Sequence, residues 1–288
     1  MSSILITILA YFIDKKFGEF SFIKHPIITF GEMIQSFEDK FYENSIQRGA
    51  LLVVSMLSIT LLASLVLEFF LNSLFGFLNI LLSSLIASVF VAHTMLIQSV
   101  KEVIEAKDIQ RKRENISKLV SRDCEHMSES DIYKASIESY AENLSDGVVA
   151  PLFYLLLFGI PGIVVYKMIN TMDSMVGYKT NKYENYGKVA AKLDDIANFI
   201  PSRLTAMLMM LSSKVARKKY GLLGFYKDGS KHESPNAGHP ITAAALILGV
   251  RLGGDTKYFG VLKTKPYFGV GRKNITKEDV QNVLRILV

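Results

Sequence analysis

The chain has 288 residues, of which 50% are hydrophobic and 21% charged, and its mean hydropathy is +0.27. Soluble domains seldom combine so apolar an average with this much charge, so the composition indicates membrane helices joined by polar loops. The net charge is +6. Because the cations cluster beside apolar segments, we interpret them as residues of cytoplasmic loops and expect no nucleic-acid partner. The single cysteine, Cys124, excludes an intramolecular disulfide and a multi-cysteine zinc site.

The first apolar segment is MSSILITILAYFI. It lacks a basic start and a small-residue cleavage site, so we interpret it as a retained helix that is too short to span a membrane alone. Two longer uncharged segments follow and predict transmembrane helices at about 50–71 and 74–99. Glu68 lies near the end of the first, either as a turn-side acid that reaches the interface or as a functional acid within the membrane.

Two stretches are rich in lysine and arginine, residues 101–123 and 213–231. By charge bias both are expected in the cytoplasm. Strand-like alternation is weak throughout, which predicts an all-α, multi-pass membrane helical bundle. We expect one membrane-embedded domain over 1–288, with further apolar helices at 196–213 and 240–252.

Residues 147–166 carry no charge but are interrupted by Gly159-Ile160-Pro161-Gly162. Proline removes a backbone donor and glycine loosens the chain. The apolar segment 148–169 is therefore predicted to be a broken helix, either re-entrant or kinked. We expect this helix to end at about residue 170. Each half is about half a bilayer core long. A re-entrant hairpin would return the following polar residues to the side from which the segment starts, whereas a kinked spanning helix would not.

Polar clusters flank this broken segment. Glu138, Glu142 and Asp146 follow one another at intervals of four, so on a helix they form a stripe that leads into the apolar run. Neither Glu138 nor Glu142 has a lysine four residues later. The stripe is therefore either a solvated acidic face or part of a cation site.

Further clusters lie at 167–178, 193–205 and 233–254. Oxygen ligands without cysteine or paired histidine favour Mg²⁺ or Mn²⁺ over zinc or copper. The metal ligands we expect are Glu142, Asp146, Asp173 and Asp194. The expected catalytic acids are the same four with Glu138 and Asp195. The expected substrate-binding residues are Asn143, Lys167, Asn170, Arg203, Asn236 and Arg251, and for Arg203 a position at the membrane interface is the open alternative. No P-loop motif is present, so any nucleotide would be bound in another way.

Four segments carry a family resemblance: SIESYAENLSDGVVAPLFYLLLFGIPG, YKMINTMDSMVGYKTNKYENYG, KLDDIANFIPSRLTA and SPNAGHPITAAALILGVRLGG. Together they resemble the adenosylcobinamide-phosphate synthase family of cobalamin biosynthesis. The match is collinear from about Ser121 to Gly254, with His25-Pro26 as an N-terminal anchor. The stretch DKKFGEFSFIKHP departs from the family, whose members commonly carry Gly-Asp-Pro before the His-Pro.

The resemblance implies an integral membrane ligase that joins the amine of aminopropanol phosphate to a propionate of adenosylcobyric acid. It implies ATP as co-substrate and a divalent cation, Mg²⁺. The expected partners are the corrinoid substrate, the amino-alcohol phosphate and the lipid bilayer. The expected location is the cell membrane, with the active site facing the cytoplasm. A broken helix with carboxylates at depth is also found in transporters, so a transporter is the alternative, as is a non-catalytic membrane sensor with this layout.

Overall fold

The computed structural model describes residues 2–20, 24–178, 180–258 and 260–286. It divides into two compact units, each built from two separate stretches of the chain. Unit 1 comprises Met1–Thr94 and Asp146–Asn198, and unit 2 comprises Met95–Ser145 and Phe199–Val288. The single domain expected over 1–288 stays a prediction. In the departing stretch before His25-Pro26, residues 21–23 lie outside the described residues.

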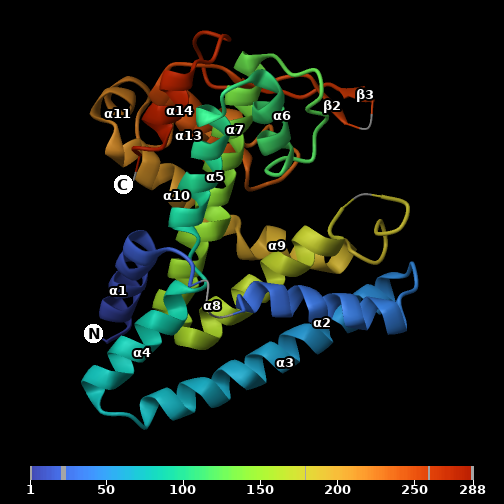
Figure 1. Ribbon diagram of the computed structural model, residues 1–288, viewed down its shortest axis with the longest axis vertical. Helices are drawn as coiled ribbons and strands as arrows, with labels where there is room; N and C mark the ends of the chain where they lie inside the picture. The colour runs from blue at the N-terminus through green and yellow to red at the C-terminus, as the bar shows by residue number, and fades with distance from the viewer. Residues whose placement is uncertain (1, 21–23, 179, 259, 287–288) are drawn as a thin grey trace. The chain divides into compact units, whose positions relative to one another are not determined.

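Unit 1 consists of helices (Figure 1). They are α1 (Ser2–Phe17), α2 (Pro26–Phe41), α3 (Ile46–Asn72), α4 (Gly76–Ser88), α8 (Ala150–Val176) and α9 (Lys188–Ala197). Within it α3 packs on α8 and α9, and α1 packs on α4. Helix α3 turns large apolar side chains outward, among them Val54, Leu62 and Phe69, each more than half exposed. Such a surface suits lipid rather than water.

Three helical stretches are long and apolar enough to cross a membrane: Ile46–Asn72, Gly76–Glu105 and Glu129–Val176. The first contains the transmembrane helix predicted at 50–71, and the second, which begins at Gly76, covers most of the one predicted at 74–99. The second is interrupted, however, between α4 and α5 (His93–Glu105). There the Ala92 amide donates to the Gly147 carbonyl at 2.9 Å, and the Asp14 carboxylate accepts from the Thr94 amide at 3.2 Å. Backbone donors that would continue one helix are thus satisfied by other segments, a feature that hydropathy does not register.

Helix α8 is a hairpin of two helical limbs. The rings of Tyr154 and Tyr166 stack with centroids 5.0 Å apart, whereas twelve residues of straight helix would separate them by about 18 Å. The Tyr166 hydroxyl also donates to the Asp146 carbonyl at 3.1 Å, across a separation that a straight helix would extend to about 30 Å. The chain therefore folds back on itself, which confirms the break predicted at 148–170. Figure 1 shows the limbs in yellow-green.

The turn of this hairpin uses three residues of Gly159-Ile160-Pro161-Gly162 in different ways. Gly159 has φ +64° and ψ −152°, a conformation open essentially to glycine alone. Pro161 lies at the start of the returning limb, where its missing N–H is not needed. Gly162 lets the limbs approach, because a Cβ there would lie 2.3 Å from the Tyr154 carbonyl oxygen. A Cβ on Gly159 would lie 2.3 Å from the Glu68 Oε1, so the Glu68 carboxylate lies at the hairpin tip.

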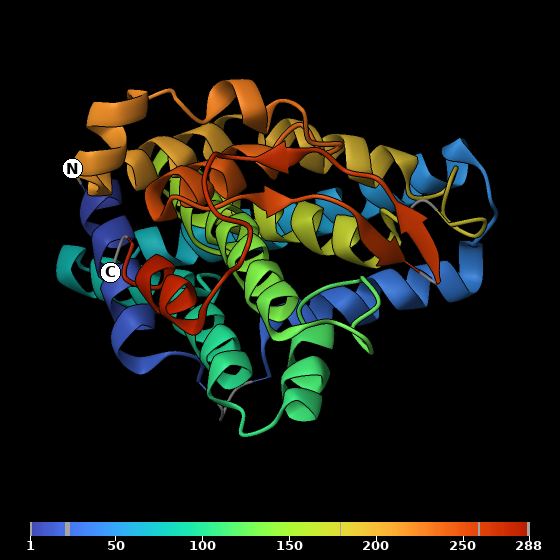
Figure 2. The same ribbon diagram turned by 90° about the horizontal axis from the view of Figure 1, so that it is seen from above.

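Unit 2 contains helices and, close to the C-terminus, short strands (Figure 2). Its helices are α5, which begins at the boundary, α6 (Ile109–Ser117), α7 (Glu129–Leu144), α10 (Phe199–Ser212), α11 (Lys214–Tyr220), α12 (Tyr226–Gly229), α13 (Gly238–Leu248) and α14 (Lys277–Val283). A π-helical turn, η1 (Ser145–Val149), follows α7 along the chain and leads into α8. The apolar helices predicted at 196–213 and 240–252 correspond to α10 and α13, and α13 ends earlier, at the left-handed Gly249.

The strands are β1 (Leu252–Gly253), β2 (Thr256–Tyr258), β3 (Val261–Lys263) and β4 (Tyr267–Phe268). Strand β1 pairs antiparallel with β4, and β2 pairs antiparallel with β3. Each has two or three residues, too short for alternation to be visible in sequence. Apart from these strands and the connecting loops, the described residues are helical, which confirms the prediction of an all-α membrane protein.

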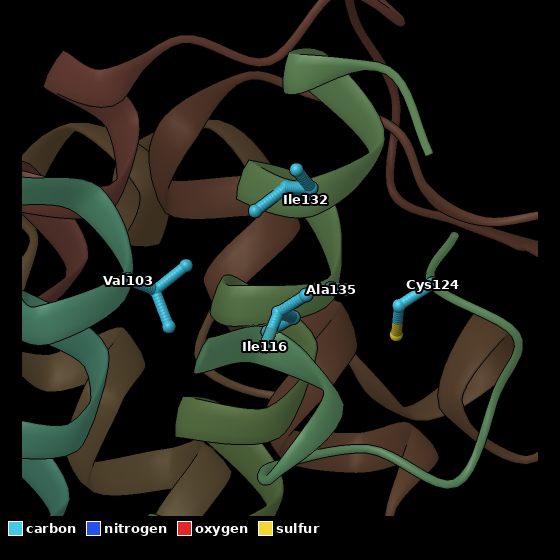
Figure 3. Packing of buried hydrophobic residues seen from close by; sticks show 5 residues of the cluster. All are labelled: Val103, Ile116, Cys124, Ile132 and Ala135. Atoms are coloured by element: carbon cyan, nitrogen blue, oxygen red, sulfur yellow. The ribbon is translucent and has the colours of Figure 1, made fainter. Parts of the chain in front are cut away.

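A hydrophobic cluster holds the α5, α6 and α7 part of unit 2 together. Its buried members are Val103, Ile116, Cys124, Ile132 and Ala135 (Figure 3). They come from three helices and from the loop before α7, which the Cys124 side chain thereby anchors. Helix α13, buried along most of its length, packs against α10 and α7 within the same unit.

Candidate functional site

The fold-back of α8 creates a buried polar network in unit 1. The Tyr166 hydroxyl lies 2.8 Å from the Asn198 side-chain oxygen and 3.1 Å from the Asp146 carbonyl oxygen, so two acceptors share its single proton. The Asn198 amide donates to Asp194 Oδ2 at 3.0 Å. The Asn170 amide lies 3.4 Å from the other oxygen of the same carboxylate. Three segments far apart in sequence thus meet in one network, which contains the main-chain carbonyl of Asp146 and the side chains of Asn170 and Asp194.

Asp194 is the centre of this network and is 9% exposed. Burial raises the pKa of its carboxyl above the ordinary value, because the charged form loses solvation. Hydrogen bonds from Asn198 and Asn170 act in the opposite direction, and the neighbouring charge of Asp195 raises the pKa further. The result is a carboxylate held in place mainly by neutral amides and more basic than a surface aspartate.

Lys167 lies on the returning limb and is 6% exposed. Its ammonium lies 3.4 Å from the Asn170 side-chain oxygen, and the charges of Asp146 and Asp194 act on it. A buried lysine needs opposite charge nearby, which these two carboxylates supply. Because Asn170 touches both Lys167 and Asp194, it joins the cation to the anion through a neutral amide.

The other two acids predicted in this part of the chain are less enclosed. Asp173 and Asp195 are half-buried. A Cβ on Gly177 would lie 2.0 Å from Asp173 Oδ1, so this carboxylate folds over the end of α8. Their catalytic roles stay predictions.

Glu138, in unit 2, has a different environment. Its Oε2 lies 2.7 Å from the Arg122 guanidinium, and its Oε1 accepts from the Gly253 amide at 2.6 Å. Both partners of the ion pair are mostly buried, with side chains 14% and 7% exposed. One carboxylate oxygen therefore fastens β1 to α7, and the other holds the loop before α7. One turn later, Glu142 and Asn143 are exposed, and Asn143 donates to the Ser139 carbonyl at 2.9 Å.

The predicted substrate residues Arg203 and Asn236 meet in unit 2. The Arg203 guanidinium donates to the Phe199 carbonyl at 2.8 Å and lies 3.4 Å from the Asn236 side-chain oxygen. It also stacks on the Phe199 ring, 3.6 Å from the centroid. Ser202, 1% exposed, lies 3.4 Å from the same Asn236 oxygen. Arg251 is exposed, and its side chain makes no hydrogen bond or ion pair within the described part of the chain.

His239 adjoins this group and is fully buried. Its ring stacks on Tyr226 at 5.2 Å and meets Phe225 edge-on at 5.7 Å. Among the described residues, neither ring nitrogen has a hydrogen-bond partner. Burial, and then the Arg203 charge, lower the pKa of His239 to about 4, so the ring is neutral at physiological pH.

Sequence reasoning did not select Arg122, Tyr166, Asn198 or His239 as site residues. Asp194 and Asn198 are four residues apart, a spacing that predicts their hydrogen bond. The partners of the other three come from distant segments, which no local spacing reveals.

Unit 2 also contains an open cavity of about 810 Å³. It lies between α6, the loop 121–128, the first turns of α7 and the β2–β3 hairpin. Most of its lining residues are polar or charged, although their carbon atoms contribute much of its surface, and Arg122 belongs to it. This cavity could not be predicted from sequence, because the β2–β3 hairpin that closes one side is too short to show a strand pattern.

No group of three or more histidine, cysteine, aspartate or glutamate side chains that could hold a metal occurs among the described residues. Mg²⁺ differs from zinc in this respect, because it is commonly held by one or two carboxylates together with substrate phosphates. The metal-binding role stays a prediction for all four expected ligands, Glu142, Asp146, Asp173 and Asp194. The metal in question would be one that enters the site together with a nucleotide.

Comparisons with known proteins agree with one another. The family model described as CobD/Cbib protein matches residues 7–287. The cobalamin biosynthesis protein CobD of Halalkalibacterium halodurans is 33% identical, over 99% of this chain and 92% of that protein. A probable cobalamin biosynthesis protein CobD of Methanococcus maripaludis is 36% identical, over 96% and 92%. The CobD of Clostridium perfringens is 44% identical over 65% of this chain and 60% of its own length. No solved structure matches the chain.

Proposed function

The chain belongs to the CobD/Cbib protein family and to cobalamin biosynthesis, and we propose that it is the amide-forming ligase of that pathway. In the proposed reaction the amine of aminopropanol phosphate attacks a propionate carboxylate of adenosylcobyric acid. The product is adenosylcobinamide phosphate. The observation that carries the proposal beyond the family is the buried network around Asp194, since amide formation needs a base in a dry site.

A carboxylate does not react with an amine until one of its oxygens is made a leaving group. ATP is the proposed source of that activation, and an acyl phosphate is its simplest product. The attacking amine must also be neutral, although an alkyl ammonium ordinarily has a pKa of about 10. A base therefore has to accept a proton as the carbon–nitrogen bond forms.

Asp194 is the proposed base. Its burial raises its pKa, which makes it a better proton acceptor than an exposed aspartate. Its two oxygens face Asn198 and Asn170, which fix its orientation without neutralising it. Lys167, joined to the carboxylate through Asn170, stabilises the charged form until the proton arrives.

The residues present fit a divalent cation that arrives on a nucleotide. Their donors are carboxylate and amide oxygens, the ligand type that Mg²⁺ prefers. Asp146 and Asp173 would contribute these oxygens, while Asp194, which the sequence also suggested as a ligand, is assigned here to the proton-accepting role because a bound cation would lower its basicity. When bound, Mg²⁺ withdraws charge from the phosphate oxygens and so assists their transfer.

Arg203 is the proposed contact for a substrate phosphate. Its guanidinium is held by the Phe199 carbonyl and the Phe199 ring, and Asn236 and Ser202 lie beside it. A planar cation with amide and hydroxyl neighbours matches a phosphate better than a lone lysine would. The proposed location is the cell membrane, with the site open to the cytoplasm, where ATP is available.

Product formation by the purified protein tests the proposal. The detergent-purified chain is incubated with ATP, Mg²⁺, adenosylcobyric acid and aminopropanol phosphate, and the amide is sought by mass spectrometry. Omission of ATP and the Asp194→Asn variant are the controls, and each should abolish the new mass. A correctly folded protein that makes no amide under these conditions would contradict the proposal.

A further inference from the structure

We infer that the 810 Å³ cavity of unit 2 receives the amide-bearing rim of the corrinoid, an inference that rests on the proposed function. The cavity lies within the range of about 300–1,000 Å³ that small-molecule sites commonly occupy. Because it is open, a large macrocycle can insert one edge without being enclosed. Its ligand class follows from the chemistry of its lining.

The charges of the lining argue against a nucleotide. Four cationic side chains face the cavity against five carboxylates: Arg113, Arg122, Lys134 and Lys257, and Glu114, Asp123, Glu125, Asp131 and Asp255. A triphosphate carries several negative charges and would meet a lining with no cationic excess. Sites that bind polyanions normally concentrate cations.

Most of the cationic side chains are already engaged. Arg122 is paired with the buried Glu138, and Lys134 lies 3.2 Å from Asp131. The Arg113 guanidinium donates two hydrogen bonds to the Met127 carbonyl, at 2.8 and 3.0 Å. What remains for a ligand is mainly a set of carboxylate acceptors, those of Glu114, Glu125 and Asp255, with Lys257 as a cationic donor.

A carboxamide matches such a lining, because its NH₂ group donates two hydrogen bonds while its oxygen accepts. The rim of adenosylcobyric acid carries many carboxamides, and the propionate carboxylate is the group that reacts. Carboxylates of the cavity would accept from the amide N–H groups, and Lys257 and Gln110 would donate to the amide oxygens. Cys124 and Met127 add an apolar contact for the ring itself.

The walls of the cavity are built before any ligand binds. The Asp123 amide donates to the Lys257 carbonyl at 3.0 Å, and the Gly260 amide donates to the Asp123 carboxylate at 2.7 Å. These bonds fix the β2–β3 hairpin to the loop before α7. The Arg122–Glu138 pair fixes the loop before α7, and the bond from Gly253 to Glu138 fixes β1, the strand that precedes the hairpin. A site held open by its own hydrogen bonds loses less entropy when it binds a ligand.

Removal of a single acid separates the two ligand classes by the sign of the effect. Glu114→Gln and Asp255→Asn take away an acceptor and a negative charge from the lining. Corrinoid affinity should fall severalfold, measured by equilibrium dialysis of the detergent-purified full chain with cobyric acid and its visible absorbance. A nucleotide would instead bind more tightly, because repulsion is reduced. Glu102→Gln, on the exposed face of α5 outside the cavity, is the matched control.

Filling the cavity gives the larger effect. Ser117→Trp and Thr256→Trp place an indole at its mouth, and Ser230→Trp places one on an exposed position elsewhere in unit 2. The first two should weaken cobyric acid binding at least tenfold and raise the KM for adenosylcobyric acid, with the KM for ATP unchanged. Undiminished cobyric acid binding in both variants, or a rise in the KM for ATP alone, would overturn the inference. Dialysis needs no turnover, so this result is distinct from a failure of the proposed ligation.

Discussion

Glu138 and Asp194 are both buried carboxylates, 6% and 9% exposed, yet their surroundings differ in kind. Glu138 faces a guanidinium and a backbone amide, and each of its oxygens has one of these partners. Asp194 faces two neutral side-chain amides, while the lysine that balances it lies beyond one of them. The first carboxylate is held in an ion pair with both oxygens bonded, whereas the second is oriented by neutral amides and its pKa is raised by burial.

The comparison separates structural from chemical use of the same residue type. A buried ion pair with directed hydrogen bonds is costly to break, and its oxygens are already bonded and not available to a substrate. A buried acid that is oriented but not neutralised has a raised pKa, which is a feature of active sites. From the sequence, Glu138 and Asp194 were both candidate catalytic acids. Their surroundings in the structure predict different effects of substitution at the two positions.

The largest effect is expected from Glu138→Leu. It leaves Arg122 buried without its anion and the Gly253 amide without its acceptor, which should cost about 3–5 kcal/mol of unfolding free energy. Thermal unfolding can be followed with a thiol-reactive dye, because the single cysteine, Cys124, is 6% exposed in the fold. The double variant Arg122→Leu, Glu138→Leu should recover much of the loss, since apolar replacement of a buried pair is often neutral. An unchanged unfolding temperature in Glu138→Leu would contradict the structural role.

Asp194→Asn should show the opposite pattern. Loss of the base should lower the rate of amide formation at least about 100-fold, or about 2.7 kcal/mol of barrier, while the fold is retained. Because the pKa of Asp194 is raised in the fold, its contribution to stability is present at low pH and is lost as the pH rises through that pKa. The asparagine variant should therefore become relatively more stable than the unaltered chain as the pH rises toward 7. Equal turnover, or a variant that is less stable at pH 7, would remove Asp194 from the role of base.

Gly159→Ala tests the hairpin that assembles the Asp194 network. The backbone of Gly159 lies where other residues are strained by about 1–3 kcal/mol, and the added Cβ would meet the Glu68 carboxylate. The variant should unfold at a lower temperature and lose part of its activity. Gly76→Ala, at a glycine with negative φ and with nothing within 4 Å of the added methyl group, is the control. If both variants behave alike, the strained turn is not what holds the two limbs together.

What could be predicted from sequence followed local periodicity. Uncharged runs located α3 and the apolar limbs of α8, and the glycines and proline located the break. The acid–amide spacing in α9 located half of the Asp194 network. Contacts over long sequence separations were not predictable: the Arg122–Glu138 pair, the capping of α5 by Asp14, and the hairpin that walls the cavity all depend on chain segments folding together. The short strands were missed because two or three residues carry no pattern.

Arg203→Lys should have a smaller effect than either acid. Lysine keeps the charge but loses the flat face that stacks on Phe199 and the second donor, so the KM for aminopropanol phosphate should rise about tenfold, or about 1.4 kcal/mol. Arg251→Lys is the companion variant, because Arg251 is the other arginine predicted to bind substrate; its exposed side chain has no ring to stack on, so the rise there should be smaller. An equal rise in both would favour the substrate-binding role that the sequence suggested for Arg251, and no rise in either would leave Arg203 as an interface residue.

The smallest effect is expected from single cysteine substitutions, which report the membrane face on which the limbs of α8 begin and end. Cysteines are introduced singly at Asn143 and Ser174, both exposed, in a Cys124→Ser background; Ser145 is unsuitable because it is 1% exposed. A hairpin that enters and leaves the membrane on one side requires both cysteines to react with a membrane-impermeant thiol reagent in inside-out vesicles and neither to react in intact cells. The two positions flank an apolar run long enough to cross a bilayer, so labelling from opposite sides is the alternative geometry. That result would leave the fold-back at Gly159 in place but would show that the hairpin does not return to the cytoplasmic face.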